Sequence, residues 1–206
     1  MKFFVNFLSA FRITAAFAII PTLMLELYWT SFILFLLGSI SDWFDGFLAR
    51  KYNVCTKLGG VLDHIGDKLL VSNTIIILAI VLASNLSELP VQGIAPWMII
   101  VPAIIMIARE LYISGLREFL GTQKIEMPVP KARFSMGKIK TTLQMIAICA
   151  LLLMPCMSTD DATQLCPYDT FAYIGVTVLW LALIASLWSA TQYTFTFAEK
   201  LKQIKD

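Results

Sequence analysis

Four aspartates lie close together in the chain, at Asp42, Asp45, Asp63 and Asp67, within sequence that is otherwise hydrophobic enough to cross a lipid bilayer. A carboxylate at membrane depth costs roughly 2.5–3.5 kcal/mol unless a partner compensates its charge. Carboxylates that share one site also repel one another. Divalent cations remove both costs, because carboxylate oxygens are ligands that Mg²⁺ and Mn²⁺ prefer. The motif therefore predicts a metal site within the membrane, where Mg²⁺ or Mn²⁺ is bound jointly with the phosphates of a substrate.

The spacing of the four aspartates indicates how they meet. Asp42 and Asp45 are three residues apart, and Asp63 and Asp67 are four apart, so each pair shares one face of a helix. The connection between the two helices is short, at about 51–58, and this forces them into an antiparallel pair. We therefore expect the four carboxylates to point into one cavity near one end of that pair.

Three glycines accompany the aspartates, at Gly46, Gly59 and Gly60. A glycine inside a helix costs about 1 kcal/mol relative to alanine, so its presence there needs a reason. Close packing of two membrane helices is one such reason and is common. Beside four aspartates, a flat ligand lying against the helices is the interpretation that we favour.

The composition is typical of a membrane protein. The chain has 206 residues, of which 58% are hydrophobic and 15% charged, with a mean hydropathy of +0.77. Soluble domains usually carry about 25% charged residues. Apolar runs that approach the length of a bilayer span lie at about 8–27, 30–50, 62–83, 94–116, 141–157 and 171–194. The sequence predicts an all-α integral membrane protein, a six-helix transmembrane bundle that forms a single domain over residues 1–206.

The positions of the basic residues predict the topology. All sixteen Lys and Arg residues lie outside three long intervals, 13–49, 69–108 and 141–199. Each interval is long enough for two spans and their connection. Because cytosolic segments of membrane proteins carry an excess of Lys and Arg, we expect both termini in the cytosol. The aspartate motif then lies on the cytosolic side of a multi-pass membrane protein.

The residues from Asp42 to Asp67 follow the pattern D-x2-D-G-x2-A-R-x8-G-x3-D-x3-D. This pattern resembles the signature of the CDP-alcohol phosphatidyltransferases at each defined position: Asp42, Asp45, Gly46, Ala49, Arg50, Gly59, Asp63 and Asp67. The resemblance implies a six-helix membrane bundle, usually a homodimer, whose active site opens toward the cytosol. Its partners are membrane lipids, and a nucleic acid is not among them.

The resemblance also implies a role for each position. Asp42, Asp45 and Asp63 would hold a pair of divalent ions, with Asp67 at the edge of the pair, and the ions would grip the diphosphate of a CDP-linked lipid. Asp67 would also be the catalytic base that accepts a proton from the acceptor hydroxyl, which attacks the lipid-side phosphorus and expels CMP. The other positions would bind the CDP lipid: Gly46, Ala49, Arg50 and Gly59.

Further segments are similar to the bacterial branch of this family that makes phosphatidylglycerol phosphate. They are N-F-L-S-A-F-R at 6–12, A-R-E at 108–110, S-G-L-R-E at 114–118 and G-K-I-K-T-T-L-Q-M at 137–145. This similarity implies CDP-diacylglycerol as the donor and glycerol 3-phosphate as the acceptor. It also implies a location in the inner (plasma) membrane of a bacterium.

An acceptor with its own phosphate needs cations that are distinct from the catalytic metals. Arg109 and Arg117 are eight residues apart, about two helical turns, so they share one face of a helix. The planar guanidinium group suits phosphate oxygens. The residues expected to bind the acceptor phosphate are Arg109, Ser114, Arg117, Lys138 and Lys140. Alternatively, these cations lie at the membrane surface and attract anionic headgroups. Glu110 and Glu118 are expected only to pair with neighbouring arginines.

Two local features stay open. His64, the only histidine, stands where this branch commonly has proline, and it either packs or lies beside the aspartates. Cys156 and Cys166 flank a connection on the side opposite the motif, and they form either a disulfide or two free thiols.

Two other functions compete with this interpretation. One is a family member with a different acceptor, namely inositol phosphate, serine or phosphatidylglycerol. The other is a divalent-cation transporter, because aspartates within a membrane also mark ion pathways. The clustering of the aspartates near one membrane face argues against a transport path.

Overall fold

The computed structural model describes residues 2–52, 57–85, 93–122, 136–156 and 167–205. For residues 2–6, 42–52, 57–60, 63–64, 85, 136–138, 156, 167–168, 200 and 202–205 the description covers the helical backbone and not the side chains. These ranges form six helices: α1 (Lys2–Met24), α2 (Tyr28–Tyr52), α3 (Lys57–Asn85), α4 (Trp97–Thr122), α5 (Met136–Cys156) and α6 (Pro167–Lys205). The prediction of an all-helical protein is confirmed.

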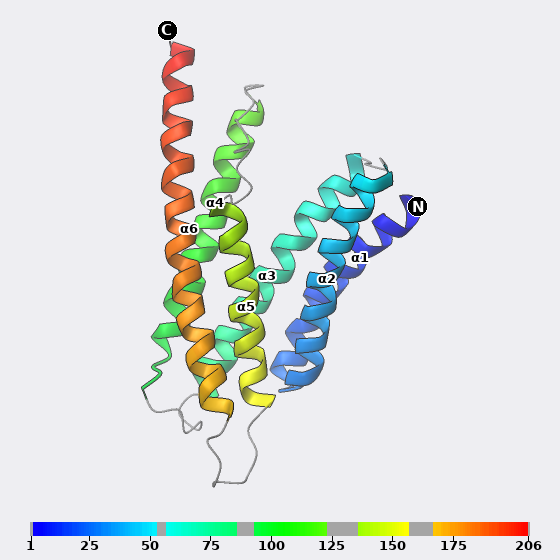
Figure 1. Cartoon of the computed structure of the whole chain (residues 1–206), viewed down its shortest axis with the longest axis vertical. Helices are drawn as coiled ribbons and strands as arrows, with labels where there is room; N and C mark the ends of the chain where they lie inside the picture. The colour runs from blue at the N-terminus through cyan, green and yellow to red at the C-terminus, as the bar shows by residue number, and fades with distance from the viewer. Residues whose placement is uncertain (1, 53–56, 86–92, 123–135, 157–166, 206) are drawn as a thin grey trace.

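Successive helices run in opposite directions along the bundle, as Figure 1 shows. The start of α1 and the end of α6 therefore lie at the same end of the molecule. The end of α2 and the start of α3 also lie there, so we call this end the motif end. The connections between α1 and α2, at 25–27, and between α2 and α3, at 53–56, are so short that these helices must pack antiparallel.

The turn between α1 and α2 shows how tightly the chain reverses. Glu26 adopts a left-handed conformation with φ of 59°, which ends α1. The backbone N–H of Glu26 donates to the carbonyl of Leu23 at 3.0 Å, and that of Leu27 donates to the carbonyl of Thr22 at 2.8 Å. The expected first span, 8–27, is therefore too long at its end, because the helix stops at Met24.

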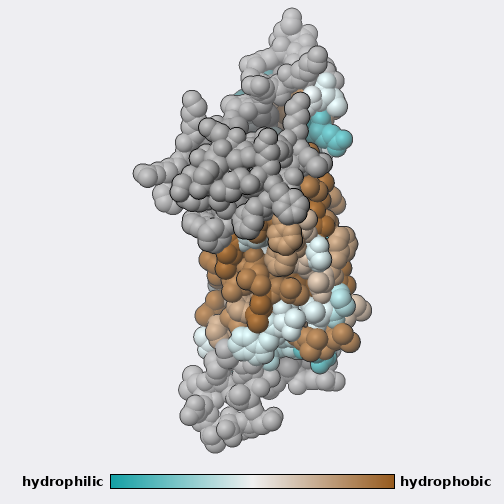
Figure 2. All heavy atoms as spheres, turned by 90° about the vertical axis from the view of Figure 1, so that its right-hand side faces the viewer, coloured by the Kyte–Doolittle hydropathy of each residue, from teal (hydrophilic) through white to brown (hydrophobic). Residues whose placement is uncertain are grey.

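Among the described residues, four helical segments are long and apolar enough to cross a bilayer, namely Phe7–Met24, Ile65–Ser84, Trp97–Thr122 and Asp169–Glu199. Two shorter apolar segments lie in the remaining helices, at Tyr28–Ser41 and Ile139–Pro155. Figure 2 shows the corresponding band of hydrophobic side chains around the middle of one face, with more polar residues toward both ends. The structure thus supports a membrane protein with several spans.

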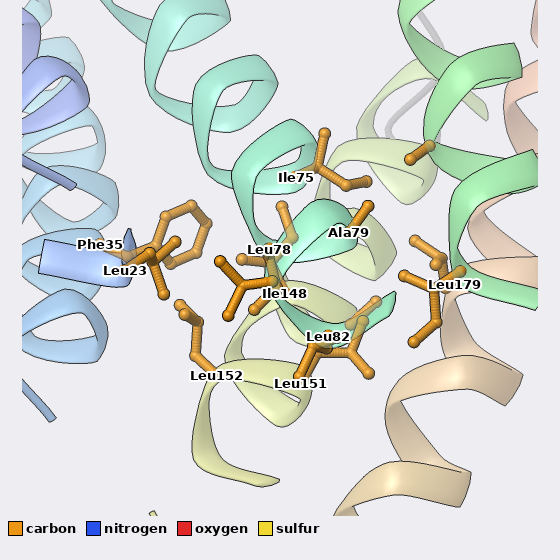
Figure 3. Packing of buried hydrophobic residues seen from close by; sticks show 14 of the residues in the cluster. Leu23, Phe35, Ile75, Leu78, Ala79, Leu82, Ile148, Leu151, Leu152 and Leu179 are labelled. Carbon is orange, nitrogen blue, oxygen red and sulfur yellow. The ribbon is translucent and has the colours of Figure 1, made fainter. Parts of the chain in front are cut away.

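The core of the bundle is built around α3, which packs against α1, α2, α4 and α5. Figure 3 shows Leu78 and Leu82 of α3 among side chains from α1, α2, α5 and α6, with Leu23, Phe35 and Ile148 close by. Small residues let the helices approach closely. A Cβ atom at Gly175 of α6, for example, would lie only 2.7 Å from Cγ of Leu151 on α5.

Candidate active site

The predicted aspartate motif lies on two consecutive antiparallel helices. Asp42, Asp45, Gly46, Ala49 and Arg50 are on the last turns of α2, whereas Gly59, Asp63 and Asp67 are on the first turns of α3. Both segments lie at the motif end. The prediction of two helices that bring the aspartates to one end is therefore confirmed. The side chains of the motif residues other than Asp67, together with His64, fall outside the described side chains, so their convergence stays a prediction.

Asp67 lines a cavity between α3, α4 and α5. The cavity has a volume of about 460 Å³, its solvent-filled mouth included. Its walls are Asp67, Lys68, Val71 and Ser72 from α3, Met106, Ile107 and Glu110 from α4, and Lys140, Thr141, Gln144 and Met145 from α5.

The walls of the cavity form two layers. The layer nearer the motif end holds its charged residues, Asp67, Lys68, Glu110 and Lys140. One helical turn deeper lies a mostly apolar layer that contains Ser72 and Gln144 as its polar members and Val71, Met106, Ile107 and Met145 as its apolar ones. The cavity therefore presents charge near the end of the bundle and closes on hydrophobic side chains farther in.

Glu110 is the centre of the charged layer. Its Oε2 atom lies 2.6 Å from Nζ of Lys140 and 3.0 Å from Nη1 of Arg109, and its Oε1 atom lies 3.9 Å from Nζ of Lys68. The expected pairing of Glu110 with its neighbouring arginine is confirmed. The pairing with two lysines from other helices was not predicted.

Lys68 has a second polar neighbour on α4. Its Nζ donates a hydrogen bond of 2.5 Å to Oγ of Ser114. The hydroxyl of Ser114 in turn donates to the backbone carbonyl of Glu110, at 2.8 Å. Ser114, which we predicted as a contact of the acceptor phosphate, therefore supports a lysine that lines the cavity.

The two arginines that we assigned to the acceptor phosphate lie on one face of α4, as expected, and this face contacts α6. Arg109 donates from Nε to the carbonyl of Ser186 and from Nη2 to Oγ of Ser189, both at 3.2 Å. The guanidinium of Arg117 lies over the ring of Tyr193, 5.3 Å from its centre. Neither arginine is among the residues that line the cavity.

The remaining predicted contacts of the acceptor are two lysines on α5. Lys140 lines the cavity, and its side chain is only 9% exposed. The side chain of Lys138 lies outside the described residues. Lys68 was not predicted as a site residue, although its position directly after Asp67 was a signal that could have identified it.

Arg12 of α1 belongs to a segment that the sequence analysis singled out. It is fully buried. A Cβ atom at Gly66 would lie 3.4 Å from Cδ of Arg12, so the arginine packs against α3 at the residue directly before Asp67. The Cβ atom of an alanine at Gly66 would make ordinary van der Waals contacts with Arg12 and Ile13.

The donor set fits a divalent metal in its chemistry. The motif supplies four carboxylates on the adjoining turns of two helices, and Asp67 borders a cavity open to small molecules. Hard oxygen ligands of this kind suit Mg²⁺ or Mn²⁺ together with substrate phosphates. The same cavity that Asp67 borders is also lined by the cations Lys68 and Lys140.

Comparison with known proteins agrees with this arrangement. Residues 3–188 match the family model of the CDP-alcohol phosphatidyltransferases. A protein of Escherichia coli (strain K12) named CDP-diacylglycerol--glycerol-3-phosphate 3-phosphatidyltransferase is 34% identical over 193 residues, which cover 90% of each chain. Proteins with the same name from Rickettsia bellii (strain RML369-C) and Shigella flexneri serotype 5b (strain 8401) are 35% and 34% identical, over 91% and 90% of each chain. The chain therefore belongs to the CDP-alcohol phosphatidyltransferase family.

Proposed function

We propose that this protein transfers the phosphatidyl group of CDP-diacylglycerol to glycerol 3-phosphate, giving phosphatidylglycerol phosphate and CMP. The observation that carries the proposal is the cavity in which Asp67 of the family motif lies beside the basic residues Lys68 and Lys140. The relatives that cover about nine-tenths of the chain have the name of this activity. The acceptor's phosphate matches the basic side of the cavity, and its hydroxyl matches the acidic side.

The donor would bind at the aspartate motif. Asp42, Asp45, Asp63 and Asp67 would hold two divalent ions, Mg²⁺ or Mn²⁺. When bound, these ions would neutralise the diphosphate and stabilise the leaving phosphate. The residues that would contact the CDP moiety are Gly46, Ala49, Arg50 and Gly59. The small side chains of Gly46, Ala49 and Gly59 would leave room for a nucleotide.

Asp67 would act as the catalytic base. Its carboxylate would accept the proton of the acceptor's primary hydroxyl, while the hydroxyl oxygen attacks the phosphorus on the lipid side. A new oxygen–phosphorus bond forms, the bond from that phosphorus to the CMP oxygen breaks, and CMP leaves with the bonding electrons. Asp67 suits this role because it borders the cavity that would hold the acceptor.

The acceptor phosphate would lie at the charged layer. Lys140 would contact it from α5, and Lys138 would add a charge near the start of the same helix. Ser114 would act through its hydrogen bond to Lys68. Arg109 and Arg117 would add positive potential from the face of α4 that contacts α6.

The membrane arrangement is also part of this proposal. All six helices would cross the inner membrane, with both termini and the motif end in the cytosol, where glycerol 3-phosphate and the nucleotide are soluble. The common end of the two termini and the gaps in the Lys and Arg pattern support it. The protein would act as a homodimer, as the family resemblance implies.

In the direct test, the purified protein is mixed with CDP-diacylglycerol and one of a series of labelled acceptors. CMP release and the entry of the label into lipid are measured. We expect labelled glycerol 3-phosphate to enter lipid, and inositol phosphate, serine and phosphatidylglycerol to be ignored. If one of these three enters lipid and glycerol 3-phosphate does not, that compound is the acceptor in place of glycerol 3-phosphate. Flux of a divalent cation into proteoliposomes without any CDP lipid would instead favour a transporter.

A further inference from the structure

Lys68 is the one cation of the charged layer that neither the motif nor the predicted acceptor contacts include. We infer that Lys68 binds the acceptor's phosphomonoester together with Lys140, and that Glu110 is the counter-ion of both lysines until that phosphate arrives. This inference rests on the proposed function, because it names the residues that select a phosphorylated acceptor.

The first argument is the position of Lys68. It follows Asp67 directly in the sequence, and both residues line the same cavity. In glycerol 3-phosphate the phosphate and the attacking hydroxyl stand at opposite ends of a three-carbon chain. A phosphate held by Lys68 therefore leaves the hydroxyl close to Asp67, which is what the transfer requires.

The second argument is the pairing of Lys68, which is weak. Its Nζ lies 3.9 Å from the nearest Glu110 oxygen, beyond hydrogen-bond distance, whereas Lys140 approaches the same carboxylate to 2.6 Å. The hydrogen bond from Lys68 goes instead to the neutral hydroxyl of Ser114. An ammonium group has three N–H donors, so Lys68 keeps donors for an anion in the cavity.

The third argument is the net charge around Glu110. Three cations, Lys68, Arg109 and Lys140, surround the single carboxylate of Glu110, which leaves two positive charges uncompensated within this group. Asp67, the other acidic residue at the cavity, belongs to the metal motif in the proposed function. A phosphomonoester carries about two negative charges near pH 7 and would balance the excess.

The fourth argument is the space that the ion pair crosses. No described Cα atom of α4 lies within 8 Å of a described Cα atom of α5, and the cavity lies between these two helices and α3. The Glu110–Lys140 pair bridges this space with two long side chains. Both Lys68 and Lys140 line this space, so a phosphate that enters it meets N–H donors from α3 and α5.

The experiment compares the wild-type protein with the variant Lys68→Met, which keeps the length of the side chain and removes its charge, and with Lys68→Arg, which keeps the charge. Each protein is purified in nanodiscs of zwitterionic lipid. Binding of glycerol 3-phosphate and of inorganic phosphate is measured by calorimetry without CDP lipid. The KM of each substrate is then measured separately.

We expect Lys68→Met to weaken phosphate binding and to raise the KM of glycerol 3-phosphate by about 10- to 100-fold, because the phosphate loses one or two charge-assisted hydrogen bonds. The KM of CDP-diacylglycerol should stay within about two-fold, and Lys68→Arg should recover much of the loss. Glu118→Gln, which removes a charge from an exposed residue of α4, is the control and should change neither KM.

Two results would overturn the inference: unchanged phosphate binding in Lys68→Met, or an equal rise of both KM values. Adding anionic lipid to the nanodiscs tests whether the site serves a lipid headgroup instead. If the wild-type protein binds phosphate in zwitterionic discs and loses that binding when anionic lipid is added, a headgroup occupies the site, and this result would also contradict us. A different result would contradict the proposed function alone. If the wild-type protein binds phosphate through Lys68 but does not use glycerol 3-phosphate in the reaction, the proposed acceptor is wrong and the role of Lys68 in phosphate binding stands.

Discussion

Nζ of Lys140 lies 2.6 Å from Oε2 of Glu110, and this ion pair links α5 to α4 across the cavity. The lysine side chain is 9% exposed, so water screens the pair much less than it screens an ion pair on a surface. Removing one partner of such a pair costs more than the pair itself contributes, because the other charge is left in a poorly solvated place.

The variant Glu110→Gln should therefore be less stable than the wild-type protein in the absence of phosphate. Arg109 and Lys140 would lose the carboxylate that accepts their hydrogen bonds, at a cost of about 1–3 kcal/mol. Thermal unfolding in detergent measures the effect, with exposed Glu118→Gln as the matched control. If Glu110→Gln and Glu118→Gln unfold at the same temperature, the carboxylate of Glu110 does not contribute to the stability of the protein.

The variant Asp67→Asn should lose turnover and keep its affinity for the CDP lipid. An amide cannot accept the proton of the acceptor, and the loss of a positioned base usually costs about 10²- to 10⁴-fold in rate. CMP release and binding of a labelled CDP lipid are the two measurements. Asp169→Asn, at an exposed residue of the first turn of α6, is the control and should be fully active. An unchanged rate for Asp67→Asn would mean that another group takes the proton.

Removal of divalent metal should abolish activity, and Mg²⁺ or Mn²⁺ should restore it. In Asp42→Asn, Asp45→Asn and Asp63→Asn, the restoring concentration of metal should be much higher than in the wild-type protein, because each variant lacks one hard oxygen ligand. A titration of activity with metal after treatment with a chelator measures this. Full turnover in the presence of the chelator would refute the metal site.

Gly175→Ala should destabilise the contact between α5 and α6. The new Cβ atom would lie 2.7 Å from Cγ and Cδ2 of Leu151 and 3.3 Å from the Leu151 backbone nitrogen, so relaxation of the side chain alone cannot accommodate it. Overpacking of this kind typically costs about 1–3 kcal/mol. Gly115→Ala is the matched control, because a Cβ atom there meets nothing within 4 Å and should leave the melting temperature unchanged or slightly raised.

Reporter fusions at the two termini should both indicate the cytosol. The even number of antiparallel helices and the shared end of the termini in Figure 1 lead to this expectation. A fluorescent reporter that folds only in the cytosol and an enzyme reporter that is active only outside it provide the measurement. Opposite signals from the two ends would mean that an odd number of helices crosses the membrane.

The sequence by itself determined the helical elements and the place of the motif on them. Apolar runs between patches of Lys and Arg are local features, so they predicted six helices at the observed places. The bounds differ most at α6, which continues past the expected end at 194 to Lys205. The short connection after Tyr52 forced α2 and α3 into an antiparallel pair, which brought the aspartate-bearing turns to one end of the bundle. The pattern of fixed residues predicted the family.

Only the tertiary structure decided which side chains meet across helices that are distant in the sequence. The sequence placed Arg109 and Arg117 on one face of α4, but only the packing showed that this face contacts α6. It also brought Lys68, Glu110 and Lys140 together from three helices. The physical reason is that helices of a membrane protein are apolar on nearly all sides, so their hydrophobic pattern does not indicate which face lies inward. The rotation of each helix is set by close packing with its neighbours.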